Sequence, residues 1–248
     1  FDHKGRAIGS HKDEYCRIYL NGQSWTVLSG FASGERAKIA MDSVFDKLFT
    51  TSGLKISTPS FNGYDPVYGG ITTYRPGTKE NGGIFVHPNP WAMIAETMLG
   101  NGDRAYQYYC ATNPALRNER ADVYECEPYV YAQNILSDEH PQFGLARNSW
   151  LTGAAAWHYI AATQFILGIR PSLDGLLIDP CIPSSWNGFT ATRKYRGKTI
   201  QIEIHNPTHI CKGVRSLELD GVRIIGNLIN FKDMRSDSHV EAWLGKED

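Results

Sequence analysis

Residues 189–204 read FTATRKYRGKTIQIEI, in which two runs of β-branched and aromatic residues flank Arg196 and Gly197. Such side chains favour strands, and glycine tolerates the positive φ that a tight turn requires. The stretch therefore predicts a β-hairpin. Similar short runs lie at 176–178, 214–219 and 222–225, with Asp220-Gly221 between the last two. The chain beyond Pro171 is accordingly predicted to be β.

Upstream of Pro171, the apolar residues follow the three-and-four spacing of amphipathic helices. The spacing predicts helices over residues 34–49, 89–99, 103–113 and 149–167. Ser33 and Asn89 are suitable N-caps, and Pro90 suits a first helical position. Helices followed by strands predict a fold that is mostly α and then β, in two segregated units with a boundary near Pro171.

The composition argues against several classes of function. A formal net charge of -1 over 248 residues gives no broad attraction to nucleic acid or to an anionic membrane. No apolar run approaches the roughly 18 residues that a membrane-spanning helix needs. The five cysteines are widely spaced and odd in number, which predicts free thiols in a reducing cytoplasm. The chain begins at Phe1 without a leader, which suggests part of a longer protein.

The first candidate site lies in residues 73–87, TYRPGTKENGGIFVH, directly before the helix predicted at Asn89. Gly82-Gly83 lets the backbone approach a ligand closely, and His87 beside a helix N-terminus is placed to meet an anion. A solvated loop with a capping histidine explains the same residues, so spacing alone leaves both interpretations open.

Two further stretches carry candidate residues. Residues 125–133, ECEPYVYAQ, place two carboxylates before Gln133, whose amide can both donate to and accept from sugar hydroxyls. Residues 143–153, FGLARNSWLTG, open the last predicted helix with hydroxyls and backbone N–H groups that suit an anion. A structural ion pair in the first, and ordinary capping by Asn148 or Ser149 in the second, are the alternatives. The sequence has no glycine-rich nucleotide loop, metal-ligand cluster or Ser-His-Asp signature.

Five ordered blocks together resemble glycoside hydrolase family 94, the cellobiose, chitobiose and cellobionic acid phosphorylases. The blocks are KENGGIF (79–85) with His87, NPW (89–91), EPYVYAQ (127–133), NSWLTG (148–153) and IDPCIP (178–183). The resemblance covers nearly the whole chain. It implies part of an (α/α)6 barrel over residues 1–170, followed by a β-sandwich over residues 171–248.

The resemblance also implies roles for individual residues. His87, Thr152 and the backbone of Gly153 would form a phosphate site, and Gln133 would belong to the non-reducing glucosyl subsite. The general acid of the family is an aspartate in an Asp-Trp-Asn-Asp block, which this sequence lacks. The acid is therefore expected in an upstream segment. Phosphate is a substrate, no metal or organic cofactor is implied, and a homodimer is expected.

The acceptor subsite implied by the resemblance contains Tyr74, Lys79 and Glu80. Arg75 adds a guanidinium, which pairs a carboxylate bidentately, so Arg75 and Lys79 predict an anionic acceptor. We therefore expect cellobionic acid to be split into α-glucose 1-phosphate and gluconate. Cellobiose and N,N'-diacetylchitobiose are the alternatives, the second because DEHPQFG (138–144) resembles the chitobiose enzymes.

In the implied mechanism, phosphate is already an anionic nucleophile and needs positioning more than deprotonation. His87 and Thr152 would hold phosphate below the anomeric carbon while the upstream aspartic acid protonates the departing oxygen. The anomer would invert from β to α. An inverting glycosidase and a noncatalytic carbohydrate-binding module are the competing hypotheses, and phosphate dependence distinguishes the three.

Overall fold

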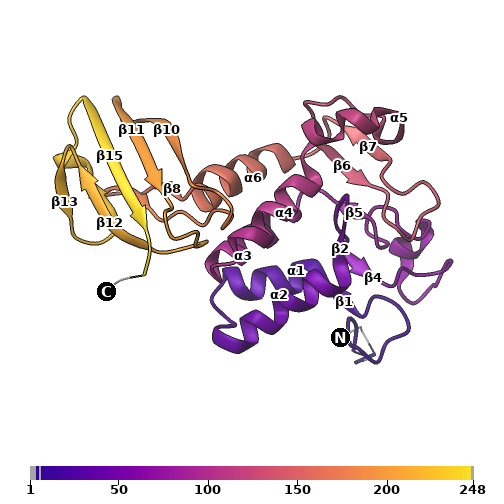
Figure 1. Cartoon of the computed structure of the whole chain (residues 1–248). Coiled ribbons are helices and arrows are strands. Elements are labelled where there is room, and N and C mark those ends of the chain that lie inside the picture. Colours follow the sequence, from indigo (N-terminus) through magenta and orange to yellow (C-terminus); the bar gives the residue numbers. More distant parts are fainter. Residues whose placement is uncertain (1–3, 6, 247–248) are drawn as a thin grey trace. The chain divides into compact units, whose positions relative to one another are not determined.

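The computed structural model describes residues 4–5 and 7–246, which form two compact units (Figure 1). The first unit extends to Leu99 and includes Gln107–His158. The second comprises Gly100–Tyr106 and the chain from Tyr159 onward. The division therefore passes through two helices, α4 (Gly102–Thr112) and α6 (Ala154–Ile160).

Three helices of the first unit pack against one another (Figure 1): α1 (Leu20–Leu28), α2 (Gly34–Leu48) and α3 (Asn89–Met98). In α2 the buried face includes Ala37, Met41 and Val44, at the spacing that the amphipathic pattern predicts. Helix α3 is buried on almost every side and forms the centre of this group. Burial of this apolar area stabilises the unit by roughly 25 cal/mol per Å².

Short antiparallel strands connect the helices of the first unit. The two-stranded pairs are β1 (Ile18–Tyr19) with β4 (Ser57–Thr58), and β2 (Phe49–Thr50) with β3 (Gly53–Leu54). A three-stranded sheet has the order β5 (Ile84–Phe85), β6 (Ala132–Ile135), β7 (Ala146–Ser149). The short helical segments are the 3-10 helices η1 (Gly69–Thr73) and η2 (Pro114–Arg120) and the α-helical turn α5 (Ala121–Tyr124). One buried cluster joins the three-stranded sheet to Ala154, the first residue of α6.

The helices predicted at 34–49, 89–99 and 103–113 are confirmed, but the prediction that Asn89 is an N-cap is wrong. Asn89 is the buried first residue of α3. Its Oδ1 accepts from the Leu54 N–H at 2.7 Å, and its Nδ2 donates to the carbonyl oxygens of Leu54 and Phe85. The amide therefore ties α3 to β3 and β5. Ser33 does occupy the N-cap position of α2, without a side-chain hydrogen bond.

The helix predicted over 149–167 is wrong in its first part. Strand β7 ends at Ser149, α6 begins at Ala154, and a π-helical segment, Ala161–Ile166, completes the run. Asn148 and Trp150 have φ values of 57° and 69°, and this left-handed conformation prevents a right-handed helix from starting there. Neither Asn148 nor Ser149 therefore caps the helix.

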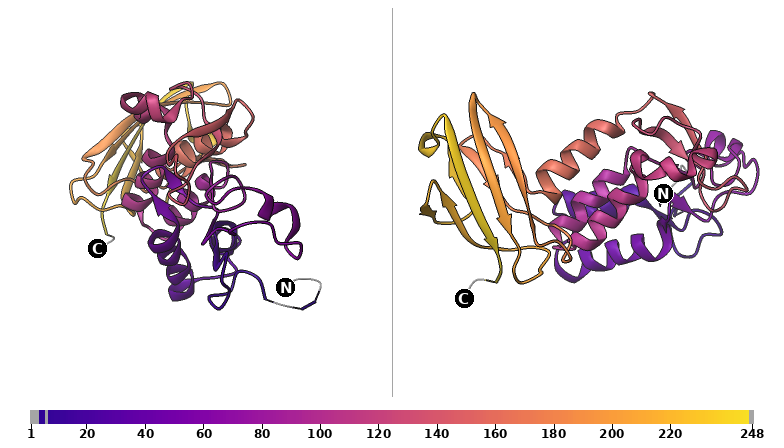
Figure 2. Two further views of the ribbon diagram at one scale, coloured as in Figure 1. Left: turned by 90° about the vertical axis from the view of Figure 1, so that its right-hand side faces the viewer. Right: turned by 45° about the horizontal axis from the view of Figure 1, so that its top comes forward.

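Eight strands in the described part of the second unit form two sheets, whose long strands appear in orange and yellow in Figure 2. The five-stranded sheet has the order β10 (Gly188–Tyr195), β11 (Lys198–His205), β15 (Asp237–Leu244), β12 (Val214–Leu219), β13 (Val222–Ile224). The three-stranded sheet has the order β14 (Leu228–Asn230), β9 (Gly175–Ile178), β8 (Ile169–Pro171). Strands β11 and β15 are parallel, and the other neighbours are antiparallel. A short 3-10 turn, η4, covers Phe231–Asp233.

The two sheets share one hydrophobic cluster, to which Ile178 of β9 and Ile202 of β11 both belong. Along β11 the buried isoleucines alternate with polar residues, because successive side chains of a strand point to opposite faces. The hairpin predicted at 189–204 is confirmed as β10 and β11. Its turn residues Arg196 and Gly197 both have positive φ, as a type I′ turn requires.

The predicted order of helices and then strands is confirmed, although the first unit also contains short strands that the sequence did not predict. The (α/α)6 barrel, the β-sandwich and the boundary near Pro171 stay predictions. All five cysteines lie in the described chain and form no disulfide there. Within residues 4–5 and 7–246, no helix has the length and apolarity to span a bilayer.

Candidate active site

The three-stranded sheet of the first unit brings His87 and Gln133 to the same end of neighbouring strands. Phe85 of β5 lies opposite Asn134 of β6, and the ladder continues one step further because the Val86 N–H donates to the Gln133 carbonyl at 3.0 Å. His87 is the next residue after Val86. The two side chains therefore start from adjacent backbone positions, although they lie 46 residues apart in the chain.

Thr152 and Gly153 lie in the turn after strand β7, and this turn contacts His87. A Cβ added to Gly153 would lie 2.9 Å from Cε1 and 3.3 Å from Nδ1 of His87, so the imidazole rests against the Gly153 backbone. Thr152 Oγ1 accepts from the Ala154 N–H at 3.0 Å, which leaves its hydroxyl proton available to another acceptor. Gln133 Nε2 donates to the Leu151 carbonyl at 3.5 Å. The structure thus brings together all four residues expected to hold phosphate and the glucosyl ring.

Aromatic rings fix one side of the His87 imidazole. The rings of His87 and Trp91 meet edge to face with centroids 5.3 Å apart. Trp91 in turn contacts Trp157 at 5.9 Å and Trp25 at 5.3 Å. Edge-to-face contacts of this kind restrict ring orientation. His87 is therefore held by α3 and α6 together.

A second histidine, His158, lies next to this group and was not predicted as part of the site. It is fully buried in α6, and burial lowers its pKa to about 4, with a further lowering from the charge of His87 and an opposing hydrogen bond to the Ala154 carbonyl. The imidazole of His158 is therefore neutral at pH 7. The sequence gave no signal that His158 lies beside the site, because it is a lone histidine in an alanine-rich helix.

The residues predicted for the acceptor lie in the loop that precedes β5. Lys79 Nζ lies 5.4 Å from the centroid of the Tyr74 ring, so these two side chains are brought together. Asn81 holds the loop in shape, because its buried amide donates to the Tyr74 carbonyl at 2.8 Å and accepts from the Phe61 N–H at 2.7 Å. Glu80 is exposed on the same loop.

Arg75 is exposed on this loop. Burial lowers the pKa of His140, and the positive charges of Arg75 and Arg147 lower it further. The backbone of the loop passes close to His140, because a Cβ on Gly77 would lie 2.8 Å from the His140 nitrogen. The convergence of Arg75 and Lys79 on one anion stays a prediction.

The two carboxylates of residues 125–133 have structural partners. Glu127 Oε1 accepts from Trp150 Nε1 at 3.0 Å, and Glu125 Oε2 lies 3.9 Å from Arg147 Nη1. Backbone and Trp150 hydrogen bonds lower the pKa of Glu127. These contacts agree with the alternative of a structural ion pair.

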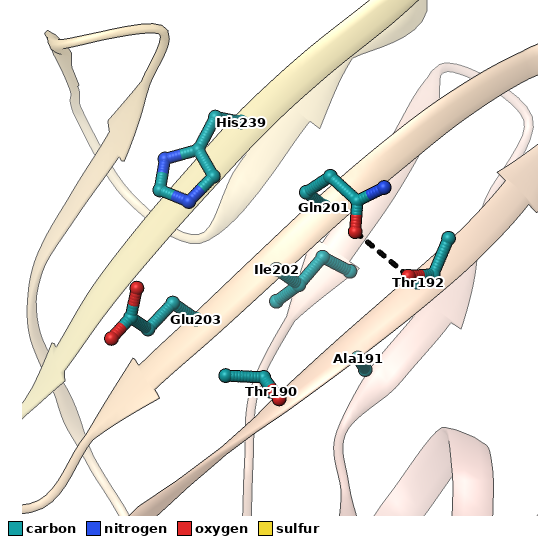
Figure 3. A pocket seen from close by; sticks show the side chains of 7 residues that line it. All are labelled: Thr190, Ala191, Thr192, Gln201, Ile202, Glu203 and His239. Atoms are coloured by element: carbon teal, nitrogen blue, oxygen red, sulfur yellow. Dashed lines mark hydrogen bonds between the residues drawn. The ribbon is translucent and has the colours of Figure 1, made fainter.

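A separate shallow depression of about 250 Å³ lies on the five-stranded sheet of the second unit (Figure 3). Gln201, Glu203 and His239 line it with two threonines, and Thr192 Oγ1 donates to Gln201 Oε1 at 2.7 Å. Its lining has no Phe, Tyr or Trp ring. Ligand sites are usually lined by apolar and aromatic side chains, so we interpret this depression as ordinary polar sheet surface.

Similarity to known proteins defines the family of this chain. Residues 1–168 match the catalytic domain of the glycosyl hydrolase 94 superfamily. The chain belongs to this superfamily, as the resemblance of its sequence blocks predicted.

Several of its relatives are phosphorylases of disaccharides. The chain is 44% identical to an N,N'-diacetylchitobiose phosphorylase of Vibrio proteolyticus, over 97% of the chain and 30% of the relative. It is 34% identical to a solabiose phosphorylase of Paenibacillus borealis, over 92% of the chain and 29% of the relative. It is 29% identical to a cellobionic acid phosphorylase of Neurospora crassa, over 79% of the chain and 25% of the relative. The chain therefore spans less than a third of the length of these relatives.

Proposed function

We propose that this chain is the C-terminal part of a longer inverting phosphorylase that transfers a β-linked sugar from a disaccharide to inorganic phosphate. The observation that carries the proposal is the contact between His87 and the Gly153 backbone, beside Thr152. An imidazole, a hydroxyl and a backbone N–H at one point form a donor set for a phosphate anion. Charge-assisted hydrogen bonds of this kind are the stronger ones in proteins.

Gln133 supplies the sugar contact in this proposal. Gln133 is the second residue of β6 and lies across the ladder from Val86, the residue before His87, and its amide donates to the Leu151 carbonyl beside Thr152. A sugar bound by this amide would therefore lie near the proposed phosphate residues. Phosphate needs positioning more than a base, and an aspartic acid from the upstream segment protonates the leaving oxygen. The proposal includes a cytoplasmic homodimer without a metal or organic cofactor.

For the substrate we propose N,N'-diacetylchitobiose, split into α-N-acetylglucosamine 1-phosphate and N-acetylglucosamine. The support is the higher identity to a chitobiose enzyme, 44% against 29% for the cellobionic acid enzyme. Cellobionic acid is the second candidate, because Arg75 is exposed and free to reach a carboxylate.

An acceptor competition tests this proposal. The full-length protein is given α-N-acetylglucosamine 1-phosphate or α-glucose 1-phosphate, with N-acetylglucosamine, glucose and gluconate at equal concentration. We expect N,N'-diacetylchitobiose as the main product, and an Arg75→Ala variant should give the same product at a similar rate. A preference for gluconate that is lost in Arg75→Ala would establish the cellobionic acid alternative instead.

The same protein distinguishes the competing classes in the breakdown direction. A phosphorylase needs phosphate to consume disaccharide, an inverting glycosidase consumes it in phosphate-free buffer, and a noncatalytic binding module consumes none under either condition. Turnover without phosphate, or no turnover with it, would contradict the proposed function.

A further inference from the structure

The imidazole of His158 is fixed at both nitrogens. Nδ1 lies 2.8 Å from the Ala154 carbonyl oxygen, and Nε2 lies 2.9 Å from Thr112 Oγ1. A carbonyl oxygen only accepts hydrogen bonds, so Nδ1 of the neutral ring carries the proton and Nε2 is an acceptor. The Thr112 hydroxyl has one proton, for which Nε2 at 2.9 Å and the Tyr108 carbonyl at 3.1 Å are both acceptors. The ring therefore links the first turn of α6 to α4 in one defined orientation.

One face of the same ring carries Tyr131. The two rings are stacked with centroids 4.0 Å apart and an interplanar angle of 26°. Tyr131 immediately precedes β6, in which Gln133 is the second residue. The stack therefore fixes the point where the strand that presents Gln133 begins.

The hydrogen bond at Nδ1 reaches the other half of the site. Its acceptor belongs to Ala154, which follows Gly153 directly, and the N–H of Ala154 donates to Thr152 Oγ1 at 3.0 Å. A displacement of Ala154 would therefore move both Thr152 and Gly153. One buried side chain thus contacts the supports of the proposed sugar residue and of the proposed phosphate residues.

We propose that His158 is a positioning residue, which sets the spacing between Gln133 and the Thr152–Gly153 turn without touching substrate. The expected effect of His158 on the reaction rate rests on the proposed function. The expected effect of His158 on the spacing of the two segments rests only on its contacts in the structure. A residue that only fills the core would contribute to stability and leave that spacing unchanged.

Three variants separate these roles. His158→Phe keeps an aromatic ring against Tyr131 but removes both hydrogen bonds, and Tyr131→Leu removes the stack. Tyr108→Phe is the control, because it deletes a buried hydroxyl that donates to Glu96 at 3.1 Å, on the same helix as Thr112. The control variant loses a buried hydrogen bond, and Tyr108 does not belong to the buried cluster of the three-stranded sheet.

The first readout is the kinetics of the full-length enzyme. Misplacement of reacting groups by about 1 Å costs up to a hundredfold in rate, so we expect kcat for phosphorolysis to fall about ten- to a hundredfold in His158→Phe and Tyr131→Leu. The KM for disaccharide should change less, and Tyr108→Phe should keep the parent kcat. Equal kcat losses in all three variants would assign His158 a merely structural role.

The second readout does not depend on activity. In the 248-residue chain, hydrogen exchange of the Val86 amide reports on the bond to the Gln133 carbonyl. We expect this amide to exchange about tenfold faster in His158→Phe than in Tyr108→Phe, at conditions where both are folded. Unchanged exchange would overturn the positioning role even in an active enzyme, whereas an inactive parent with faster exchange in the variant would overturn only the proposed function.

Discussion

The two units of the molecule use their backbones differently. In the second unit the strands β10, β11 and β15 each contain eight residues, and two of its non-glycine residues with positive φ, Arg196 and Asp220, lie in hairpin turns. In the first unit no described strand exceeds four residues. Lys79, Glu125 and Trp150 hold positive φ there in loops beside the candidate site.

This difference separates regular packing from the placement of functional groups. Non-glycine residues in the left-handed region cost free energy and concentrate where function requires a particular backbone path. The turn at Asn148 and Trp150 illustrates this, because it ends β7 and directs Thr152 and Gly153 toward His87. A substitution in the second unit should therefore affect mainly stability. A substitution in the turn that carries Thr152 and Gly153, in the first unit, should affect mainly the use of phosphate.

The largest effect on stability is expected at Gly175 in strand β9. A Cβ there would overlap the Ile229 carbonyl oxygen, which belongs to the paired strand β14 and cannot move independently. Gly175→Ala should lower the free energy of unfolding by about 3 kcal/mol, the upper range for overpacking. Urea unfolding measures this, with Gly22→Ala as control, since a Cβ at Gly22 meets nothing within 4 Å. Equal stability of the two variants would contradict the close approach of β9 and β14.

Acid should weaken the first unit through His158. Burial lowers the folded-state pKa of His158 to about 4, below an unfolded value of about 6.5. The unfolded state therefore binds the proton first, and stability is lost as the pH falls from about 6.5 to about 4. The loss amounts to roughly 3 kcal/mol at about pH 4.

Unfolding by urea at a series of pH values between 7 and 4 tests this expectation. His158→Phe should be less stable than the parent at pH 7 and should lose less additional stability on acidification. If the parent and the variant showed parallel pH dependence, another group would be responsible for the acid sensitivity.

The smallest effect on stability, but a clear one on function, is expected at Gly153. Gly153 is exposed, and the atoms that a Cβ would meet belong to the movable His87 side chain. Gly153→Ala should change the free energy of unfolding by no more than about 0.5 kcal/mol. It should raise the KM for phosphate about tenfold, because the added methyl group displaces the His87 imidazole, and loss of its hydrogen bond of about 1.5 kcal/mol to phosphate has that effect. A loss of stability without a change in phosphate use would remove Gly153 from the site.

The sequence predicted the second unit better than the first for a physical reason. The strands of the five-stranded sheet bury one face, so their alternation is visible, and Arg196-Gly197 marks a turn without tertiary information. Strand β7 instead reads ARNS, which has no strand pattern. It is a strand because β6 supplies its hydrogen bonds, and propensity alone extended the predicted helix over Ser149.

The site was predicted from its sequence blocks, and the structure adds what connects them. His87, Gln133 and Gly153 were assigned together by resemblance. The sheet register brings Gln133 opposite Val86, the residue before His87, and Gly153 contacts His87 directly. The roles of Asn81 and His158 depend on hydrogen bonds to distant backbone and side chains, which no local pattern encodes. The convergence of Arg75 and Lys79 was inferred from spacing, but side-chain direction in an irregular loop depends on tertiary contacts.

The most direct test of the account is the phosphate dependence of a His87→Ala variant of the full-length protein. Initial rates of disaccharide breakdown are measured against phosphate concentration, in parallel with the parent. Loss of a charge-assisted hydrogen bond of about 1.5–3 kcal/mol should raise the KM for phosphate about ten- to a hundredfold, while the KM for disaccharide changes less. An unchanged phosphate dependence would contradict the assignment of His87, Thr152 and Gly153 as the phosphate site.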